Sequence, residues 1–189
     1  MRTVRLATEA DAAGILAVYA PYIRDTAVTF ETETPSLDAF RCRMASIIGD
    51  YPYLVVEEDG SIVGFAYAHR LGERAAYAWN AELSIYFAPG YTSRGWGSVL
   101  FWALIDLLAL QGVRNAYSLI TVPNEVSLAL HEKLVYAHGR SEGGRLQARR
   151  LARCGVAAHG HRRLLGGPRA PHGAFRHGSR PGDRGAHRC

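Results

Sequence analysis

Residues 80–110 read NAELSIYFAPGYTSRGWGSVLFWALIDLLAL, and this stretch decides the fold. Apolar and polar side chains alternate over its first eight residues, which predicts a β-strand with Glu82 on the face opposite an aliphatic row. A Pro-Gly turn follows, and the glycine-rich run 94–98 then opens a helix that extends to Leu110. Apolar side chains nearly encircle that helix, as expected of a buried element. A strand, a glycine-rich turn and a buried helix in succession indicate an α/β domain.

The sequence on either side of this stretch completes the domain. Towards the N-terminus we expect a strand over 3–6, a helix capped by Thr8, a helix begun by Thr34-Pro35, and a hairpin of strands 53–57 and 61–69 closed by Asp59-Gly60. Towards the C-terminus we expect a strand over 115–122 and a helix that Pro123-Asn124 caps and that ends near Leu134. The predicted fold class is α/β, with a mixed, mostly antiparallel sheet flanked by helices over residues 1–134.

The glycine-rich turn is the first candidate functional feature. Gly95 and Gly97 have no Cβ, so a ligand can approach the backbone closely, and the first N–H groups of the following helix have no intrahelical partner. Such a turn suits a pyrophosphate group. Two glycines before a helix are by themselves more often an ordinary helix start, so this hypothesis needs support from elsewhere.

Glu82 is the second candidate. A partly buried carboxylate on a central strand, close in sequence to the glycine turn and flanked by Trp79 and Tyr86, can accept a proton from an amine. A solvated glutamate on a strand face is the plainer interpretation. The short distance along the chain from Glu82 to the glycine turn favours the catalytic one.

Four motifs, taken in order, resemble one family. They are YAWNAELSIYF over 77–87, SRGWGS over 93–98, Pro123-Asn124, and HEKL over 131–134. Together they resemble the phosphinothricin and methionine sulfoximine acetyltransferase branch of the GNAT superfamily of N-acetyltransferases, and the resemblance covers residues 1–134. In that family a Q/R-x-x-G-x-G loop binds the pyrophosphate of acetyl-coenzyme A. Here the loop reads TSRGWG over 92–97, so Thr92 stands where the family has a phosphate donor.

The resemblance also implies a set of site residues. Acetyl-coenzyme A would be held by a strand, the glycine loop and a helix cap, namely by Ile85, Tyr86, Phe87, Ser93, Arg94, Gly95, Trp96, Gly97, Ser98 and Asn124. Glu82 falls on the general base. Phe30, Tyr77 and His131 match positions near the acceptor pocket, although a residue such as Phe30 is more often part of the core and one such as His131 is more often a structural histidine. The reaction requires no metal, and the cysteines show no metal-site spacing.

The composition changes beyond Leu134. Residues 135–189 contain 12 Arg, no Lys and two acidic residues, whereas residues 1–134 contain 10 basic and 15 acidic residues. Arg, Gly, His and Pro dominate this segment and no helix or strand period persists, so we expect a basic, irregular and disordered tail. An arginine-rich arm that binds nucleic acid is one interpretation of it.

A change of reading frame is the interpretation that we prefer for this tail. Codons permitted for residues 135–163, when read one base later, can encode FTHMGVPKAGGYKLGAWHDVAWLHMDIA, which resembles the C-terminal segment of the same family. We therefore expect residues 135–189 to be out of frame and the last strands of the family to be lost. The edge of the sheet would then be uncovered and the chain impaired.

The predicted function is acetyl transfer from acetyl-coenzyme A to the α-amino group of a glutamate-like small molecule such as phosphinothricin or methionine sulfoximine. A protein N-terminus or a polyamine is the alternative acceptor. A protein without enzymatic activity that binds nucleic acid through its basic tail is the alternative class, but the acidic excess of residues 1–134 argues against it. The resemblance suggests a homodimer. With no cationic leader and no apolar stretch long enough to span a bilayer, we expect a cytoplasmic protein.

Overall fold

The structure is a computed structural model, and it describes residues 1–139 and 153–160. Its elements in chain order are β1 (Arg2–Leu6), the 3₁₀ turn η1 (Glu9–Asp11), α1 (Ala12–Asp25), α2 (Leu37–Ile48), β2 (Tyr53–Glu58), β3 (Ser61–Arg70), the 3₁₀ turn η2 (Ala75–Tyr77), β4 (Asn80–Phe87), α3 (Trp96–Leu110), β5 (Asn115–Val122), α4 (Glu125–Gly139) and β6 (Arg153–Gly160). Within these ranges, no helix is both long and apolar enough to cross a membrane.

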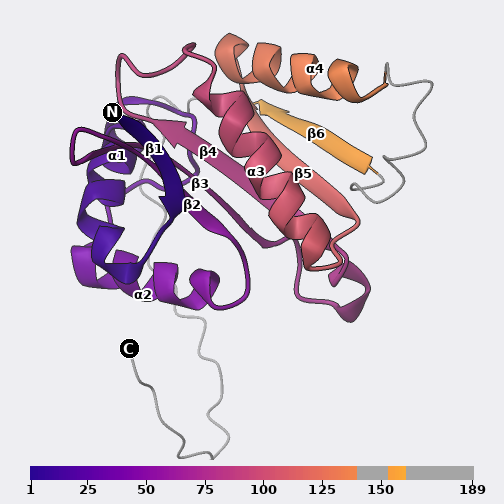
Figure 1. The fold of residues 1–189 in the computed structure, drawn as a ribbon, viewed down its shortest axis with the longest axis horizontal. Coiled ribbons are helices and arrows are strands. Elements are labelled where there is room, and N and C mark those ends of the chain that lie inside the picture. The colour runs from indigo at the N-terminus through magenta and orange to yellow at the C-terminus, as the bar shows by residue number, and fades with distance from the viewer. Residues whose placement is uncertain (140–152, 161–189) are drawn as a thin grey trace, which may run out of the picture.

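The strands form one mixed sheet, which confirms the predicted fold class. They lie in the order β1-β2-β3-β4-β5-β6 (Figure 1). Neighbours from β1 to β4 run antiparallel, whereas β5 runs parallel to β4 and β6 runs parallel to β5. The connection from β4 to β5 contains α3, because two parallel strands cannot be joined by a tight turn.

Two hydrophobic cores lie on opposite faces of this sheet. Alternate residues of β2 divide between them: Leu54 and Val56 pack with α3, whereas Tyr53 and Val55 pack with α1 and α2. The β2–β3 hairpin that sets this register turns at Asp59-Gly60 as predicted, with φ of 52° and 82° at these two residues.

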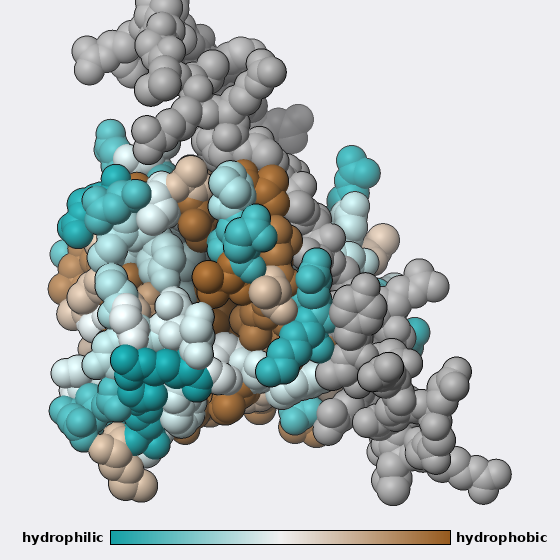
Figure 2. Space-filling model, turned by 90° about the horizontal axis from the view of Figure 1, so that it is seen from above, coloured by the Kyte–Doolittle hydropathy of each residue, from teal (hydrophilic) through white to brown (hydrophobic). Residues whose placement is uncertain are grey.

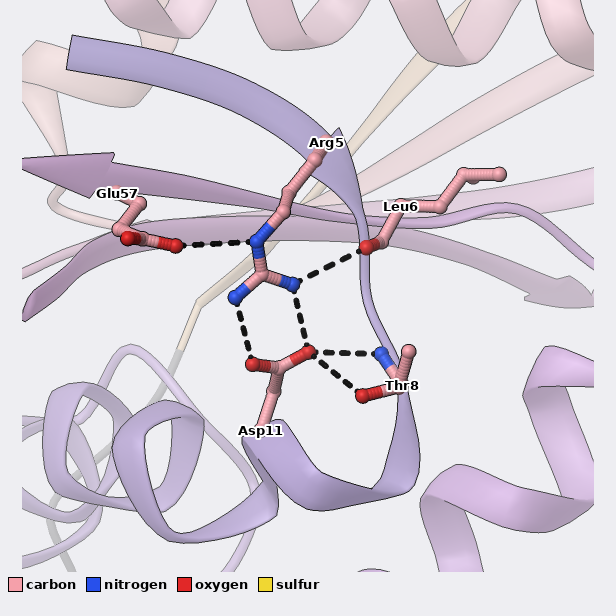
Figure 3. Close-up of polar contacts among 5 residues, drawn as sticks. All are labelled: Arg5, Leu6, Thr8, Asp11 and Glu57. Carbon is pink, nitrogen blue, oxygen red and sulfur yellow. Dashed lines mark hydrogen bonds and ion pairs between the residues drawn. The ribbon is translucent and has the colours of Figure 1, made fainter. Parts of the chain in front are cut away.

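The start of α1 is tied to the sheet by one arginine (Figure 3). Nη1 and Nη2 of Arg5 donate to the two carboxylate oxygens of Asp11, each at 2.8 Å, and its Nε donates to Glu57 at 3.0 Å. The backbone N–H of Thr8 also donates to Asp11, at 2.8 Å, which confirms the predicted capping box. The hydrogen bond from Arg5 is the main cause that lowers the pKa of Asp11 to about 2.

Three boundaries differ from the predictions. The cap of α2 is Ser36, whose Oγ accepts the N–H of Ala39 at 3.2 Å, and not Thr34. Helix α4 continues past Leu134 to Gly139, and residues 153–160, expected to be irregular, form β6.

Because β6 pairs with β5 along its whole length, from Asn115 to Val122, the expectation that this edge of the sheet is uncovered is wrong. Backbone pairing makes such an edge with little demand on side-chain type. Two predictions, disorder and a change of reading frame, also concern residues 140–152 and 161–189. These residues lie outside the part of the chain that the structure describes.

Candidate functional site

The site is a gap between two parallel strands. β4 and β5 pair only at Asn80 with Asn115, Ala81 with Ala116, and Glu82 with Tyr117, although β4 continues to Phe87 and β5 to Val122. Beyond Glu82 the strands part and leave a cavity of about 750 Å³. Its walls are residues 83–87 and 118–121, the glycine turn and the first turns of α4. This volume lies within the usual range for small-molecule sites.

Tyr22 of α1 binds the end of β4 where the gap is open. Its hydroxyl donates to the carbonyl of Phe87 at 2.6 Å, and the N–H of Phe87 approaches the same oxygen at 3.4 Å. The N–H of Ala88 donates to Val63 of β3, so by strand alternation the backbone groups of Phe87 and Ile85 face the gap. The hydroxyl of Tyr22 thus engages the backbone carbonyl and N–H of Phe87. The backbone carbonyl and N–H of Ile85 remain to pair with an extended ligand.

The glycine turn closes one end of the cavity. Ser93 and Gly95 have left-handed φ values of 60° and 85°, a conformation that favours glycine at position 95. Gly95 caps α3, and its carbonyl accepts the N–H groups of Ser98 and Val99 at 3.1 and 3.4 Å. The amides before Ser98 precede any intrahelical acceptor and are available to an anion.

The ten predicted cofactor residues divide into two groups. Eight of them line the cavity, namely Ile85, Tyr86, Phe87, Ser93, Gly95, Gly97, Ser98 and Asn124. The other two take part in contacts between a guanidinium and an aromatic ring: the Arg94 guanidinium is 5.1 Å from the ring centre of Tyr91, and the Arg2 guanidinium is 5.9 Å from the ring centre of Trp96. Thr92, the departure from the family loop, also lines the cavity.

Gly97 is required for packing as well as for ligand access. A Cβ placed on it would lie 2.9 Å from Cδ2 of Leu130 on α4, whereas a Cβ on Gly95 would meet nothing. The missing side chain at Gly97 therefore lets α3 and α4 approach each other beside the cavity.

Figure 2, which views the molecule from the side of α4, shows a band of hydrophobic side chains between hydrophilic ones.

Helix α4 contributes a polar wall. Asn124 caps the helix, since its Oδ1 accepts the N–H of Ser127 at 3.2 Å. His131 is buried with Nδ1 2.8 Å from the carbonyl of Ser127, and its ring meets Phe101 edge to face. Burial lowers the pKa of His131, so the ring is neutral at pH 7. With Nδ1 donating to Ser127, Nε2 is the acceptor nitrogen.

Glu82 occupies the last paired position, at the point where the strands part. Its side chain is not part of the cavity wall. It lies on the same sheet face as Ser84 and Tyr86, and both of these residues line the cavity. Its Oε1 is 3.7 Å from Nε2 of His69 on β3, and the carboxylate side chain is 18% exposed. The carboxylate is therefore accessible from the side of α1 and α2.

The other two predicted acceptor residues lie in loops and do not line the cavity. Phe30, between α1 and α2, is 59% exposed, and Tyr77, in η2, is 42% exposed. Phe30 is therefore not a core residue. Its loop nevertheless touches the site, because Val28 lines the cavity and its carbonyl accepts a hydrogen bond from Thr121 of β5 at 3.1 Å.

Tyr22, Ser118 and Thr121 are cavity residues that the sequence analysis did not predict. No local sequence pattern marks Tyr22 or Thr121 as a site residue. Each is placed by a hydrogen bond to a segment distant in sequence, Tyr22 to Phe87 and Thr121 to Val28. For Ser118 such a pattern exists: strand alternation over 115–122 places it with Ala116 and Ile120 on the core face, where a hydroxyl is unusual. Among the described residues, no group of three or more His, Cys, Asp or Glu could hold a metal ion.

Known proteins are similar to this chain in sequence and in fold. Residues 4–143 match the acetyltransferase (GNAT) domain family. Phosphinothricin N-acetyltransferase from Streptomyces coelicolor is 36% identical over 139 residues, covering 71% of this chain and 81% of its own. L-methionine sulfoximine/L-methionine sulfone acetyltransferase from Salmonella typhimurium is 30% identical, covering 70% and 78%. The crystal structure of a phosphinothricin acetyltransferase from Sinorhizobium meliloti in complex with AcCoA has a TM-score of 0.68 at 32% identity, covering 70% and 73%.

A mixed sheet whose parallel strands part beside a glycine-rich helix start thus defines an acyl-group transferase. The chain belongs to the GNAT acetyltransferase family. It is an acetyl-coenzyme A-dependent N-acetyltransferase. The family match runs to residue 143, past the domain boundary expected at Leu134.

Proposed function

We propose that this enzyme acetylates the α-amino group of a glutamate-like amino acid such as phosphinothricin or methionine sulfoximine. The observation that carries the proposal is the parting of β4 and β5 directly beyond Glu82, which sets a carboxylate at the inner end of a cofactor-sized gap. The acceptors of the related enzymes from Streptomyces coelicolor and Salmonella typhimurium support this choice of substrate class. Acetyl-coenzyme A is an intracellular metabolite, so the reaction would take place in the cytoplasm.

The cavity residues fit acetyl-coenzyme A. The backbone of the glycine turn would hold the pyrophosphate, and the backbone groups of Ile85 that face the gap would pair with the extended pantetheine arm. Asn124 would contact the arm from the start of α4. When bound, the cofactor supplies a thioester carbonyl as the acyl electrophile.

Glu82 would act as the general base. A free α-amino group has a pKa of about 8, so most acceptor molecules arrive as ammonium ions that cannot attack a carbonyl. Glu82 would accept that proton, directly or through one water molecule, on the sheet face that carries α1 and α2. The neutral amine then lies between this carboxylate and the gap, where its lone pair can reach the acyl carbon.

Three residues are proposed acceptor contacts. His131 lines the cavity with a neutral ring whose Nε2 can accept a hydrogen bond. Phe30 follows Val28, which the structure ties to β5, and Tyr77 precedes β4 by three residues, so both lie on loops that lead to the site. A dimer remains a prediction from the resemblance.

Substitution of Glu82 tests the proposed function. For Glu82→Gln we expect kcat/KM for the amine to fall about 10²- to 10⁴-fold, because the proton acceptor is lost while the shape is kept. The dissociation constant for acetyl-coenzyme A should change less than about twofold, since Glu82 lies outside the cavity wall.

The matched control is Glu9→Gln, which changes an exposed glutamate in η1. Rates are measured as release of free thiol with phosphinothricin, methionine sulfoximine, a polyamine and a short peptide as acceptors. A Glu82→Gln enzyme as fast as the Glu9→Gln control would contradict the assignment of the base. A preference for the polyamine or the peptide would contradict the acceptor class.

A further inference from the structure

Ser118 is a buried hydroxyl that lacks a partner. It is 3% exposed, and among the described residues its Oγ is the buried side-chain polar atom with no hydrogen-bond partner. A hydroxyl left in this state costs about 1–3 kcal/mol, so such groups in folded proteins are normally satisfied. At this position the missing partner is most simply a ligand.

The position of Ser118 shows which part of a ligand it can reach. It directly follows Tyr117, the β5 residue paired with Glu82, so it is the first β5 residue beyond the last pair, and it lines the cavity. Asn124 lies six residues further on, at the other end of the same wall. A strand rises about 3.3 Å per residue, so the four residues of β5 that follow Ser118, up to Val122, add about 13 Å of wall along which an extended arm can lie.

The neighbours of Ser118 do not satisfy it. Ser118 lies on the core face of β5 with Ala116 and Ile120, which carry no polar side-chain atoms. On α4, His131 uses Nδ1 to contact Ser127, and among the described residues no hydrogen bond joins either residue to Ser118. The hydroxyl therefore remains available to a group that enters the gap.

We propose that the Ser118 hydroxyl donates a hydrogen bond to the thioester end of bound acetyl-coenzyme A. This inference rests on the proposed function, because it requires the pyrophosphate at the glycine turn and the arm along the gap. It adds a contact from β5 to those expected from β4 and the glycine turn. No bond is made or broken in this step.

Two binding probes separate this contact from the rest of the cofactor site. The first is acetyl-coenzyme A, and the second is 3′-phosphoadenosine 5′-diphosphate, which has the nucleotide part without the arm and thioester. For Ser118→Ala in the full chain we expect the dissociation constant for acetyl-coenzyme A to rise about 5- to 10-fold, as for one lost hydrogen bond. The dissociation constant for the nucleotide probe should not change.

The melting temperature of the unliganded protein provides an independent readout. Ser118→Ala removes an unpaired hydroxyl, so the melting temperature should stay the same or rise. The matched control is Ser84→Ala, which also changes a serine of the cavity wall, but one whose side chain interacts with the partly buried Tyr67. That variant removes a partner of the tyrosine hydroxyl and should melt about 2–4 °C lower.

Each outcome decides the inference. The inference is supported if Ser118→Ala raises the dissociation constant for acetyl-coenzyme A but not that for the nucleotide probe, and if its melting temperature does not fall. An unchanged dissociation constant, an equal loss for both probes, or a melting temperature that falls as in Ser84→Ala would show that Ser118 does not bind the thioester. If the unmodified chain binds neither probe, the proposed function fails with it, whereas normal binding of both by Ser118→Ala removes this inference alone.

Discussion

At the scale of single residues, Thr92 is the departure from the family loop with the clearest consequence. It lines the cavity beside the glycine turn, at the position where the family resemblance predicts Gln or Arg. For Thr92→Arg we expect acetyl-coenzyme A to bind about 3- to 10-fold more tightly, because a guanidinium can add a charge-assisted hydrogen bond to the pyrophosphate. Titration calorimetry measures this change.

The control for this variant is Arg94→Thr with Thr92→Arg, which holds the net charge of the loop constant. Arg94 lies on the ring of Tyr91 and not on the cavity wall, so the double variant should keep the gain. If the gain disappears in the double variant, it comes from the general charge of the loop and not from position 92.

Site residues could be predicted from the sequence where they lie on a single strand and on the turn that directly follows it. Glu82, the 85–87 run and the glycines are local in sequence, and alternation fixes the face on which each lies. Tyr22 and Ser118 could not be assigned, because their roles depend on a gap between two strands that only the folded sheet creates. Phe30 and Tyr77 rested on resemblance alone, and the structure places both in exposed loops.

At the scale of elements, the start of α1 should control stability in acid. The pKa of Asp11 is lowered to about 2 from 3.8, chiefly by Arg5, so this carboxylate stabilises the fold above about pH 4. The stabilisation is lost as pH falls from about 4 towards 2, where the folded protein also takes up the proton. Arg5 is 41% exposed, so solvent screening reduces the contribution to about 1–2 kcal/mol.

The variant Asp11→Asn measures this contribution. At pH 7 its free energy of unfolding in urea should be about 1–2 kcal/mol below that of the unmodified chain, and the two should converge near pH 2. The control Glu33→Gln, in the exposed loop before α2, should give parallel curves. A difference for Asp11→Asn that stays constant from pH 7 to pH 2 would show that the effect is not electrostatic.

Element boundaries could be predicted where a local signal is unambiguous. The Asp59-Gly60 turn and the Thr8 capping box are of this kind, since each depends on residues next to one another. The start of α2 had two competing caps, and Ser36 forms the hydrogen bond that Thr34 was expected to make. β6 gave no period of its own within an Arg- and Gly-rich segment, and its pairing with β5 depends on backbone groups.

At the scale of the whole molecule, a change of frame after Leu134 would affect catalysis more than folding. Among the described residues, those that form the two cores and the cavity lie before residue 135. β6 covers the edge of β5 with backbone hydrogen bonds that any sequence except proline can make. A wall that recognises an acceptor requires particular side chains, and those encoded one base later differ from the ones present. We therefore propose that the chain as written still binds acetyl-coenzyme A but is impaired in transfer.

Restoring the frame from Val135 onwards tests this proposal. The restored chain should acetylate an amino-acid acceptor at least about 10²-fold faster than the chain as written, because a mispositioned acceptor forfeits most of the advantage of proximity. Both should bind acetyl-coenzyme A within about threefold, since the gap and the glycine turn are common to them. Resequencing the gene across the codon for Leu134 shows independently whether a base has been gained or lost. Equal transfer rates, or an unbroken frame at that codon, would contradict the proposed change of frame and its effect on transfer.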